Sequence, residues 1–340
     1  MRVTGFRLSY VSIPLERAFV TALRRVTAAE AVRIELIGDN GRIGIGEAPP
    51  TKAVTGEGEK EIEETIERTI LPEIVNRNFD SLSEALDVLH SCCDGRSSAK
   101  AAVDIALHNL FGGADYRAEG YIEVKSAVTI SLGGAEEMAR DAAEAVRRGC
   151  DVLKVKLGGL DGMDIRRIEA VRNSAPEAKL LADANQAWSE REALHIMESI
   201  APFGIELVEQ PLPASDLDGM RRVAAAGVLP VLADETVFTL EDAKRVMESA
   251  AADMINIKLM KCGGVSKAVE ILKWCEANGV ECMLGSMLET PVSIEAAVRV
   301  AACFRNCIRF IDLDSPLLYK RVPEDSAIRV ENSVLKLETR

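Results

Sequence analysis

Apolar and polar positions change their spacing near residue 123, and this change divides the chain into two regions. In the first region, segments of alternating apolar and polar residues predict three antiparallel strands, at 3–13, 29–38 and 42–48. The DNG at 39–41 is a hairpin turn signal between the last two of these strands. Helical periodicity follows from 59 to 112, so we expect the first region to combine a meander with helices.

The second region repeats a β/α unit at nearly constant length. Short apolar strands alternate with amphipathic helices, and reference residues near the strand ends are spaced 24 to 27 positions apart: Lys156, Asp183, Glu209, Asp234, Lys258, Gly285 and Asp312. Such alternation predicts a parallel sheet, and eight strands make a TIM-type barrel. No helical pattern follows the last strand, so a (β/α)7β barrel fits best.

The predicted fold class is therefore α/β, a modified TIM barrel with an α+β capping domain before it. We expect three parts along the chain: a capping domain at 1–122, the (β/α)7β barrel with the catalytic site at 123–316, and a tail at 317–340. The tail contains two short strand patterns, and we expect it to return to the capping domain and complete it.

Two strands of the barrel carry lysines on one face. In DVLKVKLGG at 151–159, side chains alternate, so Lys154 and Lys156 share a face and the apolar residues share the other. The sixth strand repeats this pattern with Asn256 and Lys258. Because the apolar face packs against the outer helices, we expect Lys154 and Lys156 inside the barrel on one side and Lys258 on the far side.

Three neighbouring strands end in carboxylates, at Asp183, Glu209 and Asp234. A single such residue is more often a helix N-cap or a solvated strand end. Three together would repel one another strongly unless a cation neutralised them. Oxygen ligands without a nearby histidine or cysteine suit a hard divalent cation, so the sequence predicts a site for Mg²⁺, with Mn²⁺ as the other option.

The lysines and the acids together predict a reaction at a carbon next to a carboxylate. A neighbouring ammonium, a metal ion and partial burial all lower the pKa of a lysine, so we expect the lysines to act as bases. One lysine would remove the α-proton, leaving an enediolate stabilised by the metal and Lys154. A base on the opposite face would return a proton and invert the α-carbon.

Composition narrows the classes of function further. The chain has 340 residues and a formal net charge of −13, and its arginine pairs are scattered, which argues against binding to nucleic acid. Neither a membrane span nor a secretory signal peptide is apparent. Eight cysteines without a CxxC spacing indicate reduced thiols. We therefore expect a cytoplasmic protein that acts on a small molecule, with neither nucleic acid nor membrane as a partner.

These motifs resemble those of one known family, and the resemblance extends over the whole chain. The following residues are similar to the active-site pattern of the enolase superfamily, in its muconate-lactonising subgroup: KxK (Lys154, Lys156), DAN (Asp183), EQP (Glu209), ADE (Asp234) and Lys258. The resemblance implies Mg²⁺ on the three acids, with Lys156 and Lys258 as the two bases. The branches of the superfamily that use a histidine base do not fit.

Within this subgroup the chain resembles dipeptide epimerases of the L-Ala-D/L-Glu type. Asp312 and Asp314 of FIDLDSP match the DxD that binds the dipeptide ammonium in such enzymes, and the segments 14–27 and 47–57 resemble their two capping-domain loops. The resemblance implies a specificity pocket in which Arg24 meets the side-chain carboxylate of glutamate. It also implies these further substrate-binding positions: Phe19, Val54, Asn185, Asn256, Ser286 and Met287.

The activity implied is that of an isomerase, a Mg²⁺-dependent dipeptide epimerase that inverts the C-terminal residue of a dipeptide by two-base 1,1-proton transfer. Two alternatives stay open. One is another reaction of the same scaffold: N-acylamino-acid racemase, o-succinylbenzoate synthase or muconate cycloisomerase, against which the DxD argues. The other is a non-catalytic small-molecule binder, against which the complete set of acids and lysines argues. A homo-oligomer also stays open, because relatives are often oligomeric but the sequence carries no interface signal.

Overall fold

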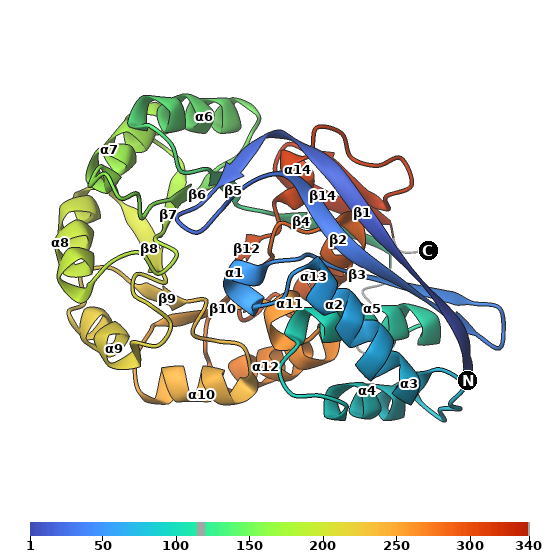
Figure 1. The fold of residues 1–340 in the computed structure, drawn as a ribbon. Helices are drawn as coiled ribbons and strands as arrows, with labels where there is room; N and C mark the ends of the chain where they lie inside the picture. Colours follow the sequence, from blue (N-terminus) through green and yellow to red (C-terminus); the bar gives the residue numbers. More distant parts are fainter. Residues whose placement is uncertain (114–119, 339–340) are drawn as a thin grey trace.

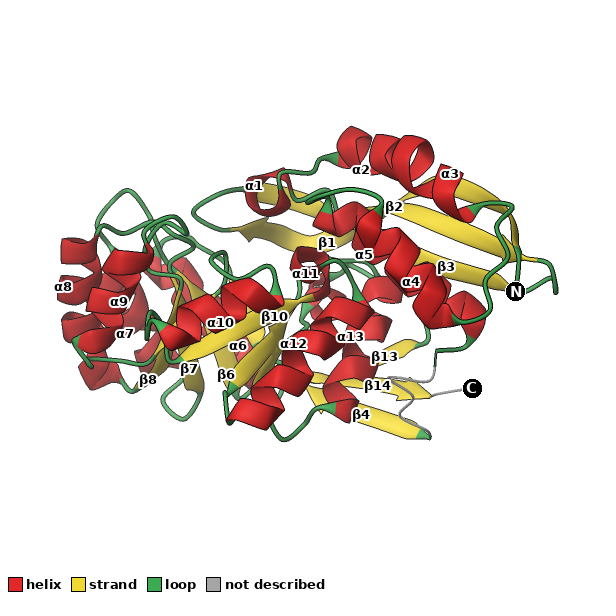
Figure 2. Cartoon of the chain, turned by 90° about the horizontal axis from the view of Figure 1, so that it is seen from below, coloured by secondary structure: helices red, strands yellow, loops and turns green. Residues whose placement is uncertain are grey.

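The computed structural model describes residues 1–113 and 120–338, and it begins with the expected antiparallel meander (Figure 1). Its three strands pair in chain order: β1 (Val3–Val20), β2 (Arg25–Gly38) and β3 (Ile43–Ala48). The first two strands are longer than predicted because pairing resumes beyond an irregularity between Pro14 and Phe19, where Val20 pairs with Arg25. The tip of this hairpin therefore reaches over the barrel (Figures 1 and 2).

One buried helix covers a face of this sheet. The helices of this part are α1 (Lys52–Thr55), α2 (Glu59–Thr65), the π-helix η1 (Ile66–Ile70), α3 (Leu71–Ile74), α4 (Leu82–Ser91) and α5 (Ser97–Phe111). α5 packs against β3 so closely that a Cβ atom on Gly46 would lie 1.8 Å from the carbonyl oxygen of Ala102. Glycine in β3 is thus required by the close approach of the helix backbone.

Eight parallel strands form the predicted barrel. They are β5 (Val128–Ile130), β6 (Val152–Lys156), β7 (Lys179–Asp183), β8 (Ile205–Glu209), β9 (Val231–Ala233), β10 (Met254–Lys258), β11 (Cys282–Gly285) and β12 (Ile308–Asp312), hydrogen-bonded in this order. The seam between β5 and β12 contains a backbone hydrogen bond from Ala127 N to Ile311 O of 2.7 Å. The barrel is therefore nearly closed.

Seven of the eight strands are followed by an outer helix, as the (β/α)7β prediction requires. These helices are α6 (Ala135–Arg147), α7 (Asp164–Ser174), α8 (Glu190–Ile200), α9 (Leu217–Ala225), α10 (Leu240–Glu248), α12 (Val265–Asn278) and α13 (Pro291–Cys303). Three short helices add to them: η2 (Ala201–Phe203), α11 (Leu259–Cys262) and α14 (Ser315–Leu318). No described helix is long and apolar enough to cross a membrane.

The inner face of the barrel is apolar at one level and polar above it. The lower level is a buried cluster of Ala127, Leu181, Leu207, Leu232, Met254, Met283 and Phe310. The polar level lies two residues further along four of these chain segments. It consists of Asp183, Glu209, Asp234 and Asn256, all of which are buried. The predicted alternation is thus confirmed, and the polar groups lie at the carboxyl ends of the strands, where TIM barrels have their active sites.

The tail contacts the capping sheet, but its two strands pair elsewhere. β13 (Ile328–Glu331) and β14 (Val334–Glu338) form a sheet with β4 (Tyr121–Lys125) in the order β13-β14-β4. Contact with β1 comes from a bridge between Leu15 and Tyr319 and from Lys320 N, which donates to Pro14 O. We retain 1–122, 123–316 and 317–340 as proposed domain boundaries.

Two buried carboxylates of the capping domain reach the N-termini of barrel helices. Glu47 of β3 accepts hydrogen bonds from Thr290 Oγ1 (2.6 Å) and Val292 N (3.3 Å) at the start of α13. Asp104 of α5 accepts hydrogen bonds from Val265 N (2.7 Å) at the start of α12. A carboxylate is stabilised at a helix N-terminus, so these contacts fix the base of the capping domain on the barrel.

Candidate active site

A pocket lies at the carboxyl ends of the barrel strands, beneath the capping domain. It brings together twelve of the fifteen residues singled out in the sequence: Phe19, Arg24, Val54, Lys154, Lys156, Asn185, Asp234, Lys258, Ser286, Met287, Asp312 and Asp314. The other three, Asp183, Glu209 and Asn256, do not line the pocket but are buried within hydrogen-bond or ion-pair distance of one another or of its lysines.

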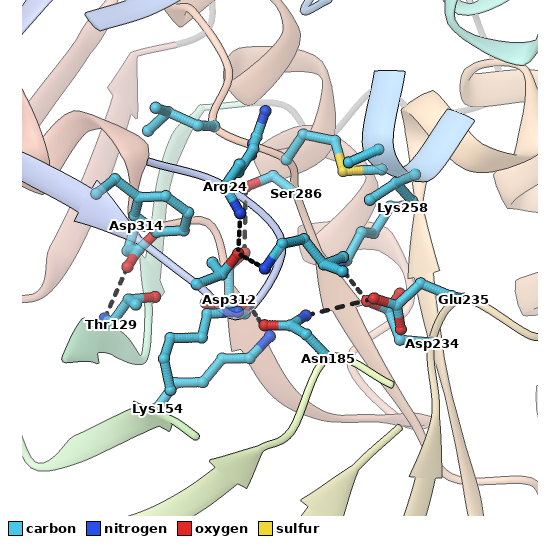
Figure 3. A pocket seen from close by; sticks show the side chains of 18 residues that line it. Arg24, Thr129, Lys154, Asn185, Asp234, Glu235, Lys258, Ser286, Asp312 and Asp314 are labelled. Atoms are coloured by element: carbon cyan, nitrogen blue, oxygen red, sulfur yellow. Dashed lines mark hydrogen bonds and ion pairs between the residues drawn. The ribbon is translucent and has the colours of Figure 1, made fainter. Parts of the chain in front are cut away.

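The register of the sheet sets the polar groups at one level. Lys156 on β6 pairs with Asp183 on β7, and Asp183 pairs with Glu209 on β8. β6 and β10 are four strands apart in a sheet of eight, so Lys156 and Lys258 approach from opposite sides of the barrel. Figure 3 shows Lys258 and Asp314 at opposite sides of the pocket.

Each acid at the strand ends forms ion pairs with buried lysines. Lys156 Nζ lies 2.6 Å from Asp183 Oδ2, and Lys258 Nζ lies 2.6 Å from Asp234 Oδ2. Lys154 Nζ lies among three carboxylates, at 2.7 Å from Glu209 Oε2, 2.7 Å from Asp312 Oδ2 and 3.2 Å from Asp183 Oδ2. In this arrangement the lysine ammonium groups supply the positive charge that the acids require.

The pKa values of the acids differ according to these partners. Burial raises the pKa of Asp183, but the charges of Lys156 and Lys154 outweigh it and the pKa is lowered overall. The pKa of Asp234 is also lowered, since Lys258 and Lys261 outweigh its burial. Burial and the charge of Asp183 raise the pKa of Glu209 to about 8. Glu209 is therefore the acid in this group that most needs a further positive charge to stay ionised at neutral pH.

Neighbouring carboxylates raise the pKa values of two of the three lysines. Burial alone would lower the pKa of Lys258, but Asp234 raises it overall. The pKa of Lys154 is likewise raised against the effect of its burial, by Asp312, Glu209 and Asp183. In the folded chain the nearby carboxylates therefore outweigh the burial of these two lysines, while the expected effect of a metal ion on them stays a prediction.

Gly285 at the end of β11 leaves room for Lys258. A Cβ atom at this position would lie 2.7 Å from Asn256 Oδ1 and 3.1 Å from Lys258 Cε. Asn256 in turn donates from Nδ2 to Glu209 Oε1 at 2.9 Å. Any larger residue would displace both side chains, so glycine is required by the approach of Lys258 to the pocket.

The two aspartates of the eighth strand reach the pocket together, as predicted. Asp314 Oδ2 accepts a hydrogen bond from Thr129 N at 2.7 Å, whereas Asp312 Oδ2 accepts one from Lys154 Nζ (Figure 3). Burial and the charge of Asp312 raise the pKa of Asp314 to about 6. One oxygen, Asp312 Oδ1, is buried without a hydrogen-bond partner. This side of the pocket therefore favours a cationic group with several hydrogen-bond donors.

The capping domain contributes one cation to the pocket. Arg24, near the tip of the β1–β2 hairpin, is half-buried, and burial lowers its pKa. Its Nη1 donates to Thr51 Oγ1 at 3.5 Å, and no described carboxylate lies within 4.0 Å of its guanidinium. Phe19 also lines the pocket, with its ring 5.9 Å from Lys156 Nζ. Arg24 is thus placed to pair with an anionic group of a bound molecule.

Comparison with known proteins agrees with this geometry. Residues 5–115 match the N-terminal domain of the mandelate racemase/muconate lactonizing enzyme family, and residues 137–340 match its partner, described as enolase C-terminal domain-like. The L-amino acid-D/L-Glu epimerase of Sulfurimonas denitrificans is 44% identical over 96% of both chains. The chain belongs to the mandelate racemase/muconate lactonizing enzyme family.

Two solved structures have the same fold over nearly the whole length. The L-Ala-D/L-Glu epimerase of Bacillus subtilis, in a substrate-liganded complex, is 38% identical and superposes with a TM-score of 0.93 over 99% of this chain and 96% of its own. The dipeptide epimerase of Enterococcus faecalis, complexed with Mg and L-Leu-L-Tyr, is 34% identical with a TM-score of 0.92 over 99% of this chain and 97% of its own. The mandelate racemase/muconate lactonizing architecture is therefore shared throughout, including the capping domain.

Sequence reasoning missed several residues of the site. The pocket is also lined by Thr21, Leu23, Ala53, Thr129, Glu235 and Leu288. Outside it, the buried Lys261 lies 2.6 Å from Asp234 Oδ1 and donates to Asn256 O at 2.9 Å. Lys261 could have been suspected from its place three residues after Lys258. It lies on α11 rather than on a strand, however, so the alternation that identified the other lysines does not apply to it.

The three strand-end acids fit the hard divalent cation expected in this family. No described group of acidic, histidine or cysteine side chains has the geometry of a formed metal site, and each of the three acids is paired with a lysine. Yet Glu209 Oε2 and Asp234 Oδ1 are buried and accept no hydrogen bond, only ion pairs with lysine. Oxygen donors of this kind suit Mg²⁺. Asp183, Glu209 and Asp234 are the residues that would hold it.

Proposed function

We propose that this enzyme is a Mg²⁺-dependent dipeptide epimerase, with L-Ala-D/L-Glu as its best substrate pair. One observation carries the proposal: Lys156 and Lys258 face one pocket from opposite sides of the barrel. The test is a mass-spectrometric screen of L,L-dipeptides in D₂O with Mg²⁺. Deuterium at the α-carbon of the C-terminal residue, together with the L,D product, is the expected result. No exchange into any dipeptide would exclude the proposal.

The proton transfer follows from the placement of the two lysines. Lys156, in its neutral form, takes the α-proton from one face, and the C–H electron pair moves into the substrate carboxylate to give an enediolate. Lys258, in its protonated form, delivers a proton to the opposite face. The configuration of the α-carbon is then inverted. The reverse reaction exchanges the roles of the two lysines.

A bound Mg²⁺ would withdraw electron density from the substrate carboxylate and so make the α-proton more acidic. The chain's own residues supply the rest. Asp183, Glu209 and Asp234 form one acidic group at the strand ends. Lys154, whose Nζ lies among three carboxylates, places a further positive charge beside the position where the enediolate develops negative charge.

Two charged groups of an Ala-Glu dipeptide, its ammonium and its glutamate side chain, match the remaining charged groups of the pocket. Its ammonium would meet Asp312 and Asp314, which offer an oxygen without a hydrogen-bond partner. Its second side chain would meet the loops of the capping domain, where Arg24 has no carboxylate within 4.0 Å among the described residues. Binding at both ends orients the reacting carbon between the two lysines, which converts binding energy into rate. Phe19, Val54, Asn185, Asn256, Ser286 and Met287 complete the proposed substrate-binding set.

Arg24 is expected to favour an acidic second residue. A carboxylate paired with a partly buried guanidinium gains about 1.5–3 kcal/mol, so Arg24→Met should lower kcat/KM for Ala-Glu by roughly 10- to 150-fold. Ala-Leu and Ala-Phe should be spared, because their side chains do not need the charge. Steady-state kinetics on the three dipeptides provides the measurement. An equal loss on all of them would assign Arg24 a structural role.

N-acylated substrates are expected to react poorly, which separates this function from that of an N-acylamino-acid racemase. Acylation removes the ammonium that Asp312 and Asp314 would bind, so N-acetyl-Ala-Glu and N-succinylamino acids should be turned over at least about 30-fold more slowly than free Ala-X dipeptides. The double variant Asp312→Asn, Asp314→Asn should narrow this difference by impairing only the free dipeptides. Equal turnover of acylated and free substrates would favour the racemase.

The remaining parts of the proposal concern where and with what the enzyme works. The cysteines of the chain are free, which fits the reducing cytoplasm. The proposed partner is a small dipeptide, and the net charge of −13 argues against binding to nucleic acid. Size-exclusion chromatography with light scattering would decide whether the enzyme works as a homo-oligomer.

A further inference from the structure

A second cavity lies between the capping domain and the barrel and shares no lining residue with the active-site pocket. It has a volume of about 370 Å³. The start of α5 forms its capping side, and the loop before α10, together with α11 and the start of α12, forms its barrel side. Figures 1 and 2 show α5 beside α11 and α12 in this region. The cavity therefore lies where the two domains meet.

Lys100 of α5 lines this cavity and forms no close ion pair. Its exposed fraction is only 9%. Within the described chain, its Nζ forms neither an ion pair within 4.0 Å nor a hydrogen bond, although every other buried lysine does. Lys100 Nζ is not among the described buried polar atoms that lack a partner, so the ammonium keeps contact with the space of the cavity. A lysine that faces a cavity of this size without an ion pair is available to an anion that enters it.

The charges around Lys100 are mostly positive. The lining contains the basic residues Arg96, Lys100, Lys261 and Lys267 and the acidic residues Glu241 and Glu270. Lys267 pairs with Glu270 at 3.0 Å, and Lys261 is engaged with Asp234. Arg96 has no ion pair within the described residues. Two cations, Arg96 and Lys100, thus remain for a ligand.

Two buried carboxylates near these cations, Glu57 and Asp104, are already engaged. Glu57 interacts electrostatically with Arg96 and Lys100, but its oxygens accept hydrogen bonds from Ser98 N (2.8 Å) and Ala99 N (3.1 Å). It caps the N-terminus of α5 rather than pairing with a side chain. Asp104 does the same for α12. The chain therefore satisfies both helix ends itself and leaves the side-chain cations of the cavity unmatched.

We propose that this interdomain cavity binds a small oxyanion, a phosphate or a carboxylate, through Lys100 and Arg96, with Lys267 at the same wall. Such an anion would join α5 to α12 and so stabilise the contact between the domains. It would also adjoin α1, whose Thr55 lines this cavity while Ala53 and Val54 line the active-site pocket. The site is thus placed to act on the loop that contacts the substrate side chain.

Thermal unfolding of the full-length enzyme tests the proposal independently of its activity. The melting temperature is measured in rising sodium phosphate and, in a parallel series, sodium acetate, with ionic strength held constant by sodium chloride. Because a ligand of the folded state stabilises it, we expect a saturable rise of about 3 °C in at least one series. The series that gives the rise identifies phosphate or carboxylate as the ligand chemistry. No rise beyond that in chloride alone overturns the proposal.

Three variants assign the effect to the cavity. Lys100→Met should weaken anion binding at least about tenfold, since it removes a charge-assisted hydrogen bond. Arg96→Gln, at an exposed position, should weaken it as well and decides the question if Lys100→Met does not fold. Lys60→Met is the matched control, because Lys60 is an exposed lysine of the capping domain outside the cavity. If the anion raised the melting temperature of Lys100→Met as much as that of the wild type, the proposal would be overturned. If Lys100→Met does not fold, the same result with Arg96→Gln would overturn it.

Discussion

Lys258→Ala is expected to abolish epimerisation while leaving α-proton exchange into one epimer intact. General acid–base catalysis by a positioned side chain contributes about 10²- to 10⁴-fold, so interconversion should fall at least 100-fold. The same should hold for Lys156→Ala, with the opposite epimer still exchanging. By analogy with the family, Lys156 serves the L epimer and Lys258 the D epimer.

The measurement combines chiral analysis with mass spectrometry in D₂O, starting from each epimer separately. Lys60→Ala provides a control, because this lysine is exposed and lies outside the pocket. If Lys258→Ala still interconverted the epimers at near the wild-type rate, the two-base assignment would have to be abandoned. Loss of exchange from both epimers in one variant would show that a single lysine serves both faces.

Removal of the divalent cation is expected to abolish activity without unfolding the chain. Glu209→Gln should have a similar effect, lowering kcat/KM by at least about 100-fold, as for loss of a group that holds a metal ion in place. The fold should survive, because Lys154, Lys156 and Lys258 already neutralise the strand-end acids. Circular dichroism after chelation should therefore be unchanged, and added Mg²⁺ should restore turnover.

Glu206→Gln is the matched control for this prediction. Glu206 lies on the same strand as Glu209, but its side chain is on the outside of the barrel, 3.6 Å from Arg309. This variant should retain wild-type activity and metal dependence. Full activity of Glu209→Gln, or of the exhaustively chelated enzyme, would exclude the proposed role of the acids.

The sequence predicts the barrel and its polar level well, because both depend on local rules. Alternation along each strand places Lys154, Lys156 and Lys258 inside, and the even spacing of the units brings their ends to one level. The hairpin was less predictable. Pro14 marks the point at which a strand pattern would usually end, yet pairing resumes after it, because this proline lies on the edge strand β1.

The electrostatics of the site could not be predicted from the sequence in the same way. The pKa of Lys258 depends on its 2.6 Å contact with Asp234, which comes from a different strand. The unpaired state of Lys100 depends on how α5 meets α11 and α12, and no local pattern encodes that contact. The pKa of a buried group and its ion pairs depend on distances between charges on separate elements. Both can therefore be determined only from the folded chain.

The contacts of Glu47 and Asp104 with helix N-termini restrict how the capping domain can move over the pocket. Because these buried contacts hold the base of the capping domain, a rigid swing of the whole domain would have to break both. The end of the β1–β2 hairpin, which carries Arg24, could lift without breaking them, but it would have to release the hydrogen bonds from Val20 N to Ser131 Oγ (3.2 Å) and from Leu132 N to Val20 O (2.9 Å). Loop motions take nanoseconds to microseconds, whereas domain hinges take microseconds to milliseconds. Opening of the hairpin should therefore be faster than a swing of the whole capping domain.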